Sequence, residues 1–190
     1  MACSTTRPAD RPTSAPPPED ASEYYPLKAG WRWAYDIEKD GQQILAIYAV
    51  VQRDGDTAIM QAGDERLVYA VLPEGIVRGE RGREPGNDDF LLKSPLRLGA
   101  QWPILGGTAT VAAVAKTVTV PAGDFSNCVV VEENRSAPAR LVRTTYAPGT
   151  GPIAVDLLVH DEVTGVFQPA LRARLRGVTA PGTDPTGLPP

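Results

Sequence analysis

From Tyr24 to residue 180 the chain alternates short apolar-rich runs with glycine, proline and aspartate turns, a pattern that restricts it to a fold of β-strands. The 19 prolines and 18 glycines among 190 residues disfavour long helices. The runs that predict strands are residues 31–39, 42–53, 57–62, 66–72, 75–81, 108–120, 127–134, 140–147, 151–160 and 170–179.

The turns and the residue pattern within the runs indicate that neighbouring strands are antiparallel. Asp40-Gly41 and Asp54-Gly55 are favoured two-residue hairpin turns, because glycine accepts positive φ. Residues 171–176 read LRARLR, which sends apolar and arginine side chains to opposite faces. The sequence therefore predicts an all-β fold: a single curved antiparallel sheet, half-barrel or barrel-like meander, with little helix.

Two segments leave alternatives open. Residues 108–115 are rich in alanine and could be helical, but the flanking threonines and valines favour a strand. Residues 82–100 contain several glycines and prolines, and they predict a long loop or a pair of short elements.

The chain divides into three parts by composition. Residues 1–22 are rich in Pro, Ser and Thr without apolar periodicity, so we expect a disordered, semi-extended tether. Residues 23–180 form the predicted all-β domain, and residues 181–190 a disordered tail.

One motif occurs twice. Residues 26–33 read PLKAGWRW and residues 95–102 read PLRLGAQW, which share the pattern Pro-Leu-basic-x-Gly-x-x-Trp. Proline favours an extended approach, leucine anchors it, glycine turns it, and tryptophan starts a strand and fills one end of the core. The pattern alone leaves open whether the whole sheet is duplicated.

Three motifs carry a resemblance to a known group of proteins. They are YPL with Gly30, Trp33 and Tyr35, then VTVPAGDFSNC at residues 118–128, and YAPGTG at residues 146–151. Together they resemble uncharacterised Gram-negative periplasmic and outer-membrane lipoproteins. The resemblance implies a curved antiparallel sheet, loosely like the half-barrels of lipoprotein carriers, and it implies no activity.

The same resemblance bears on Cys3. Met-Ala-Cys-Ser ahead of a Pro/Ser/Thr tether is similar to the end of a lipoprotein signal, where a small residue precedes the cysteine that is lipidated. It implies a domain on the periplasmic side of the envelope, anchored to the outer membrane through Cys3. The alternative is an incidental cysteine in a disordered tail.

Composition excludes several classes of function. A net charge of -4 and a pI near 5.1 argue against nucleic-acid binding. Cys3, Cys128 and His160 give neither a disulfide framework nor the ligand spacing of a zinc site. We expect no cofactor or metal, and membrane contact only through a lipid anchor.

No catalytic constellation is visible, so we expect a protein that is not an enzyme. The sequence contains no Gly-x-Ser-x-Gly motif whose serine His160 could activate as a general base, so His160 is expected at the surface. Cys128 precedes three valines, which is typical of a buried cysteine. Asp88 and Asp89, in the long loop, are the acidic pair that best suits a cation, but they lack a calcium-loop pattern.

Two groups of residues are candidates for ligand or partner contact. Trp31 is expected on the face opposite to Trp33, free of the core. The second group is a basic stripe of arginines that would suit an anionic surface or an acidic partner, although a solvated, edge-protecting face is the alternative. The stripe consists of Arg172, Arg174 and Arg176, with Arg140 and Arg143 as additional members.

These features favour a non-enzymatic cell-envelope lipoprotein domain that acts as an interaction or structural module, with an unknown envelope protein as its partner. The alternative is a carrier or binding module for a lipid-like apolar ligand in a half-barrel. A carrier requires an open, apolar interior, whereas an interaction module has a filled interior and an exposed apolar patch.

Overall fold

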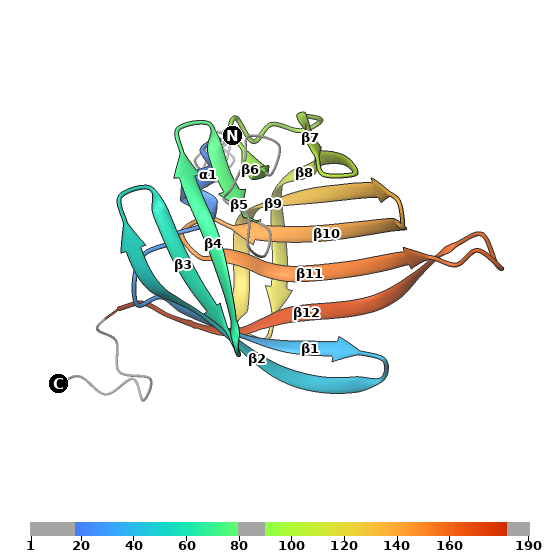
Figure 1. Cartoon of the computed structure of the whole chain (residues 1–190), viewed down its shortest axis with the longest axis horizontal. Coiled ribbons are helices and arrows are strands. Elements are labelled where there is room, and N and C mark those ends of the chain that lie inside the picture. Colours follow the sequence, from blue (N-terminus) through green and yellow to red (C-terminus); the bar gives the residue numbers. More distant parts are fainter. Residues whose placement is uncertain (1–17, 80–89, 182–190) are drawn as a thin grey trace, which may run out of the picture.

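The computed structural model describes residues 18–79 and 90–181 of the chain, which form one curled sheet and one short helix (Figure 1). All strand pairs are antiparallel, so the predicted all-β fold class is confirmed. The elements are α1 (Ala21–Tyr24), β1 (Arg32–Lys39), β2 (Gln42–Asp54), β3 (Thr57–Ala62), β4 (Glu65–Leu72), β5 (Gly75–Arg78), β6 (Phe90–Lys93), β7 (Gln101–Ile104), β8 (Gly107–Val120), β9 (Gly123–Ser136), β10 (Ala139–Ala147), β11 (Gly151–His160) and β12 (Phe167–Thr179).

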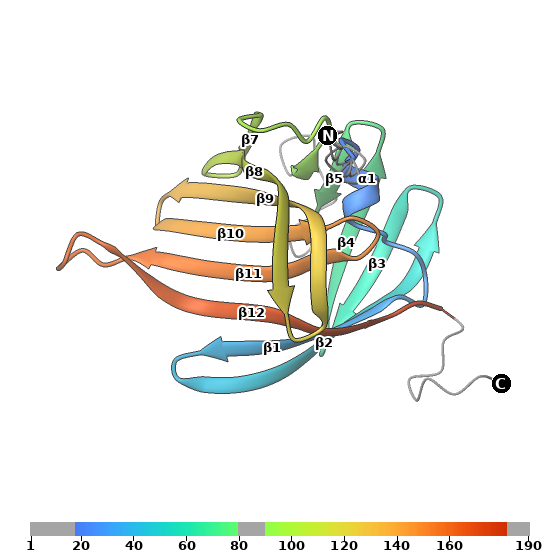
Figure 2. The same ribbon diagram turned by 180° about the vertical axis from the view of Figure 1, so that it is seen from behind.

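The sheet consists of two consecutive six-stranded meanders. Its described strands run in the order β6-β5-β4-β3-β2-β1-β12-β11-β10-β9-β8-β7, so the two halves join where β1 pairs with β12. The accumulated twist brings the outer strands β6 and β7 into contact without pairing, and the sheet becomes a nearly closed barrel (Figures 1 and 2).

The repeated motif adopts the same geometry at the start of each meander. Gly30 has φ +86° and donates its N–H to the carbonyl of Val50 at 2.8 Å. Gly99 has φ +80° and donates to the carbonyl of Val111 at 2.9 Å. The positive φ explains the glycine in both copies. The duplication left open by the sequence is therefore present in the structure as two equivalent starts to two six-stranded halves.

The tryptophans of the two copies are also equivalent. Trp33 and Trp102 are buried, and each indole N–H donates to a backbone carbonyl from another segment. Trp33 binds the carbonyl of Thr150 at 2.7 Å, and Trp102 that of Phe90 at 2.9 Å. The expectation that both tryptophans pack in the core is confirmed.

Most segment boundaries agree with the sequence pattern, with instructive differences. Residues 108–115 belong to β8, so the strand alternative is correct. The described part of 82–100 contains one short strand, β6, and β7 begins just after this range at Gln101. The fold includes residues ahead of 23, because Ala21 is buried and Leu96 donates a backbone hydrogen bond to Glu19. Residues 1–17 and 182–190 lie outside the described residues.

The core is concentrated at one end of the barrel. In β10 the buried residues are 144–147, and in β12 they are Ala173 and Leu175, whereas the opposite ends of both strands are more exposed. Figures 1 and 2 show that the β11–β12 hairpin extends beyond the body at this less buried end, where the β1–β2 hairpin also turns. Helix α1 and the residues after it fill the buried end, where the Tyr24 hydroxyl donates to the carbonyl of Asn127 at 2.8 Å.

Close contact between β8 and β9 predicts that Gly107→Ala is destabilising. A Cβ atom added to Gly107 would overlap the carbonyl oxygen of Asn134 in the neighbouring strand. We expect the free energy of unfolding in urea to fall by about 1–3 kcal/mol. The matched control is Gly177→Ala in β12, where an added Cβ meets no atom within 4 Å, and its change should stay within about 0.5 kcal/mol. Equal losses in the two variants would contradict this packing.

Candidate functional site

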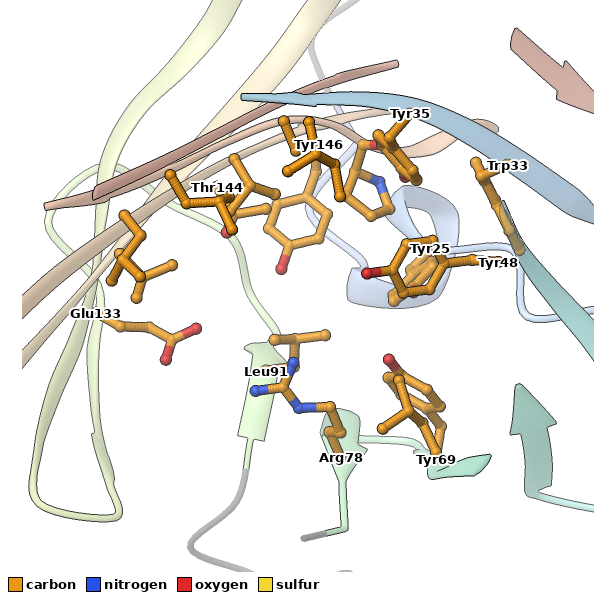
Figure 3. Close-up of a pocket in the computed structure, with 18 of the residues that line it drawn as sticks. Tyr25, Trp33, Tyr35, Tyr48, Tyr69, Arg78, Leu91, Glu133, Thr144 and Tyr146 are labelled. Carbon is orange, nitrogen blue, oxygen red and sulfur yellow. The ribbon is translucent and has the colours of Figure 1, made fainter. Parts of the chain in front are cut away.

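A cavity of about 490 Å³ lies inside the curled sheet and is partly open to solvent (Figure 3). This volume lies within the range of about 300–1,000 Å³ that is typical of small-molecule sites. Most of the strands contribute to its wall. The described lining residues are Tyr25, Trp33, Tyr35, Ile37, Tyr48, Glu65, Leu67, Tyr69, Arg78, Leu91, Glu133, Arg135, Arg140, Val142, Thr144, Tyr146, Pro152, Val155, Leu157, Leu171 and Ala173.

Aromatic rings form the inner end of the cavity. Tyr25, in the segment after α1, packs edge-on against Trp33 and Tyr69, with ring centroids 5.9 and 5.7 Å apart. Its ring also lies 6.3 Å from that of Tyr146. Figure 3 shows the hydroxyls of Tyr69 and Tyr146 directed into the same space, whereas the Tyr25 hydroxyl donates to Met60 Sδ at 3.8 Å. The inner end is therefore apolar in its rings and polar in its hydroxyl groups.

One wall of the cavity is apolar. It is formed by neighbouring strands β1, β12, β11 and β10, each of which sends alternate side chains inward. These apolar lining residues are Ile37, Val142, Val155, Leu157 and Leu171. Such a wall suits hydrocarbon but offers it no directional contact.

The other wall is charged. Glu133, in β9, is only 8% exposed, and its carboxylate pairs with the Arg135 guanidinium at 3.0 Å. Arg78 projects from β5 into the cavity, where Figure 3 shows its guanidinium directed toward Glu133 and the Tyr146 hydroxyl. Burial lowers the pKa of Arg78, but the potential of Tyr69, Glu133 and Tyr146 outweighs it, so the pKa is raised and the guanidinium stays charged.

Neither Arg78 nor Arg140 is neutralised by a direct partner in the part of the chain that the structure describes. The buried Nε of Arg140 has no hydrogen-bond acceptor. Arg140 faces the cavity, whereas Arg143 lies on the outer face and pairs with Glu132 at 2.6 Å. The expectation that Arg140 joins the stripe is wrong, because residues three apart in a strand point to opposite faces. Arg143 does share the outer face, since it lies across from Asp156, which in turn lies across from Arg172.

The three central arginines of the predicted stripe lie together on the outer face of β12. Arg174 and Arg172 approach Asp156 at 2.7 and 3.9 Å, and Arg176 pairs with Asp36 at 2.8 Å. Strand β12 lies between β1 and β11, so these side chains do not protect an edge. Their positive charge is largely matched by aspartates, and a partner contact there stays a prediction.

Trp31 lies on the same side as Trp33, not on the opposite face. The two rings are 5.8 Å apart, and Trp31 is half-buried against the core. The expectation of opposite faces is wrong because residues 31 and 33 differ by two, the period of a strand. Trp31 is not among the cavity-lining residues, so its contact role stays a prediction.

The remaining sequence candidates do not converge on the cavity. Cys128 is buried, as expected, and burial raises the pKa of its thiol to about 11. His160 ends β11 and packs against Phe167 with ring centroids 5.5 Å apart. Cys3, Asp88 and Asp89 lie outside the described residues. Within residues 18–79 and 90–181 there is no group of three His, Cys, Asp or Glu side chains suited to a metal ion.

The residues that give the cavity its character could not be identified from the sequence. Tyr48, Tyr69, Tyr146, Arg78 and Glu133 come from strands far apart in the chain. Alternation in each strand could have grouped the inward residues of β10, but not with those of β4 and β5.

Among the described residues, no helix is long and apolar enough to span a bilayer.

No protein-family model matches the chain, and no curated protein matches it. Two solved structures are similar. A Bacteroides fragilis protein, described as exported and as having a YmcC-like fold, is 14% identical with a TM-score of 0.43, and the match covers 83% of this chain and 99% of that one. A Parabacteroides distasonis protein, described as a lipoprotein, is 12% identical with a TM-score of 0.48, covering 84% and 100%. Likeness at this level transfers no function.

The buried tyrosines predict loss of stability in alkali. Burial raises the pKa of Tyr24 to about 12, and it raises the pKa values of Tyr25, Tyr35 and Tyr146 above the ordinary 10.0. The folded chain thus keeps these hydroxyls protonated at a pH where the unfolded chain ionises them. Their stabilisation is complete below the unfolded pKa and is lost as pH rises through the folded values.

We therefore expect the urea unfolding midpoint to fall between about pH 8 and about pH 11. Ultraviolet absorbance should show delayed tyrosine ionisation in the folded protein. Tyr146→Phe removes one such group, so its midpoint should fall less steeply with pH. An unchanged wild-type midpoint, or ordinary ionisation of all six tyrosines before unfolding, would contradict the buried cluster.

Proposed function

We propose that this domain is a non-enzymatic binding protein that takes a small, lipid-like amphipathic molecule into its barrel. The observation that carries the proposal is the cavity of about 490 Å³ with an apolar wall facing a charged one. The sequence ranked an interaction module slightly above a carrier. The open interior favours the carrier, because an interaction module has no need of such a space.

The cavity chemistry supports binding in preference to catalysis. Its described lining contains no serine, cysteine, histidine or lysine. Raised pKa values keep Tyr25 and Tyr146 protonated, so neither hydroxyl is an effective nucleophile or base near neutral pH. Arginine, tyrosine and glutamate remain, and these groups hold and orient a ligand.

An interaction surface is the second candidate, and it rests on a different observation. Ile44, Leu45 and Ile47 on the β1–β2 hairpin are 49%, 57% and 55% exposed. Val51 extends this exposed apolar run along β2 with an exposed fraction of 53%. A partner that received or delivered the ligand could use this hairpin, which lies along the lower edge of the barrel in Figure 1.

We also propose an address on the periplasmic side of the cell envelope. The support is the Met-Ala-Cys-Ser start and the Pro/Ser/Thr-rich stretch that follows it. Lipidation of Cys3 would tether the barrel to the outer membrane and leave its interior free to exchange a ligand.

Native mass spectrometry tests the binding proposal. The full chain with Cys3→Ser is exported to a bacterial periplasm and purified without detergent. We expect a reproducible additional mass of lipid size, which organic extraction removes. A consistently ligand-free mass, with no uptake of added single-chain lipids, would contradict the proposal.

A cavity-filling variant locates the ligand. Ala173→Leu adds side-chain volume to the interior wall of β12, so the bound fraction should fall several-fold. The control is Ala34→Leu, on the outer face of β1, which should retain the bound mass. Equal retention by both variants would place the ligand outside the barrel.

A further inference from the structure

We propose that the ligand carries an anionic oxygen head group that Arg78 binds inside the barrel, with its hydrocarbon chain against the apolar wall. The inference rests on the proposed binding function and specifies the chemical class of its ligand. A carboxylate and a phosphate monoester share this chemistry, because each has two or more oxygens that accept hydrogen bonds from one guanidinium.

The first argument is the isolation of Arg78 within the described structure. It makes no hydrogen bond or ion pair there, although it lines a cavity to which eight other strands also contribute residues. The carboxylate toward which it points, Glu133, already pairs with Arg135 at 3.0 Å. Arg78 keeps some contact with solvent through the open side of the cavity, so its guanidinium is accessible and has donors free for an anionic ligand.

The tyrosine hydroxyls around Arg78 supply the second argument. Tyr69 is its direct cross-strand partner, and the Tyr69 and Tyr146 hydroxyls face the same space (Figure 3). A protonated phenol donates a hydrogen bond to an oxyanion, and the raised pKa of Tyr146 keeps its proton in place. Arginine and tyrosine together form a set of donors that matches an acid and not an amine.

The charges along the cavity support the same sign of ligand. The described lining holds three arginines, Arg78, Arg135 and Arg140, but two glutamates, Glu65 and Glu133. This leaves an excess of positive charge in a protein whose total is -4. The local sign therefore opposes the global one, which is the pattern of a site that selects an anion.

Arg140 extends this potential toward the less buried end. It lies six residues from Tyr146 on the same strand, or roughly 20 Å along β10. Its buried Nε has no acceptor. An anion that entered from this end would be attracted by Arg140 as well as by Arg78, while its hydrocarbon contacts the apolar lining at Leu157 and Leu171.

The test compares matched ligands on the full chain with Cys3→Ser after extraction of any bound lipid. Palmitate, lysophosphatidic acid and neutral hexadecanol compete with a fluorescent fatty acid. We expect both anions to bind at least about tenfold more tightly than hexadecanol, because a hydrogen bond to a charged group contributes this much. Palmitate above lysophosphatidic acid would identify a carboxylate head group, and the reverse order a phosphate.

Substitution then assigns the preference to Arg78. Arg78→Gln should lower palmitate affinity about tenfold and leave hexadecanol unchanged. Arg143→Gln on the outer face of β10 is the control and should keep the wild-type preference. If Arg78→Gln fails to fold, the comparison of anionic with neutral ligands on the chain with Arg78 intact still tests the proposal.

The outcomes separate the two proposals. Hexadecanol bound as tightly as palmitate, or full preference for the anion in Arg78→Gln, would overturn the head-group inference and leave the binding function intact. Failure of all three ligands to bind would overturn the binding function itself. Loss of affinity in Arg143→Gln equal to that in Arg78→Gln would place the anion outside the barrel.

Discussion

The barrel depends on hydrogen bonds that fasten α1 and the start of β1 to the turn between β10 and β11, across one end. The N–H of Gly149 donates to the carbonyl of Glu23 at 2.7 Å, and the Trp33 indole donates to Thr150 at the same distance. Gly151 has φ +107°, and an added Cβ would lie 3.2 Å from Trp33 and Tyr25, so glycine permits this approach. Because these contacts close this end, the apolar residues pack there and the opposite end stays open.

The three motifs that carry the lipoprotein resemblance meet at this closed end. Tyr24, just before the first motif, binds the carbonyl of Asn127 in the second, and Trp33 of the first binds the third at Thr150. These motifs therefore specify how the barrel is closed. The charged wall of the cavity, with Arg78 and Glu133, lies outside all three. Proteins that share the motifs can thus differ in what they bind.

The local alternation of apolar and polar residues predicted most of the strands, because strand formation depends mainly on residues that are close in the sequence. The short strands β6 and β7 were harder to identify, since they are four residues each and lie among prolines and glycines. The cavity could not be predicted, because it depends on the direction and extent of the curl. Tyr69 and Tyr146 are 77 positions apart in sequence, yet both pack against Tyr25. The faces of Trp31 and Arg140, by contrast, follow from strand periodicity alone.

The contact between β6 and β7 gives the barrel a longitudinal seam. At every other junction between described strands, widening the barrel would break a ladder of backbone hydrogen bonds. At the seam, the two edges approach without such a ladder, so a change in the circumference of the barrel requires the least free energy there. The edges also shield each other from pairing with another chain, and Pro103 in β7 removes a donor from one of them. The same unpaired junction thus allows the barrel to widen and protects it from edge-to-edge aggregation.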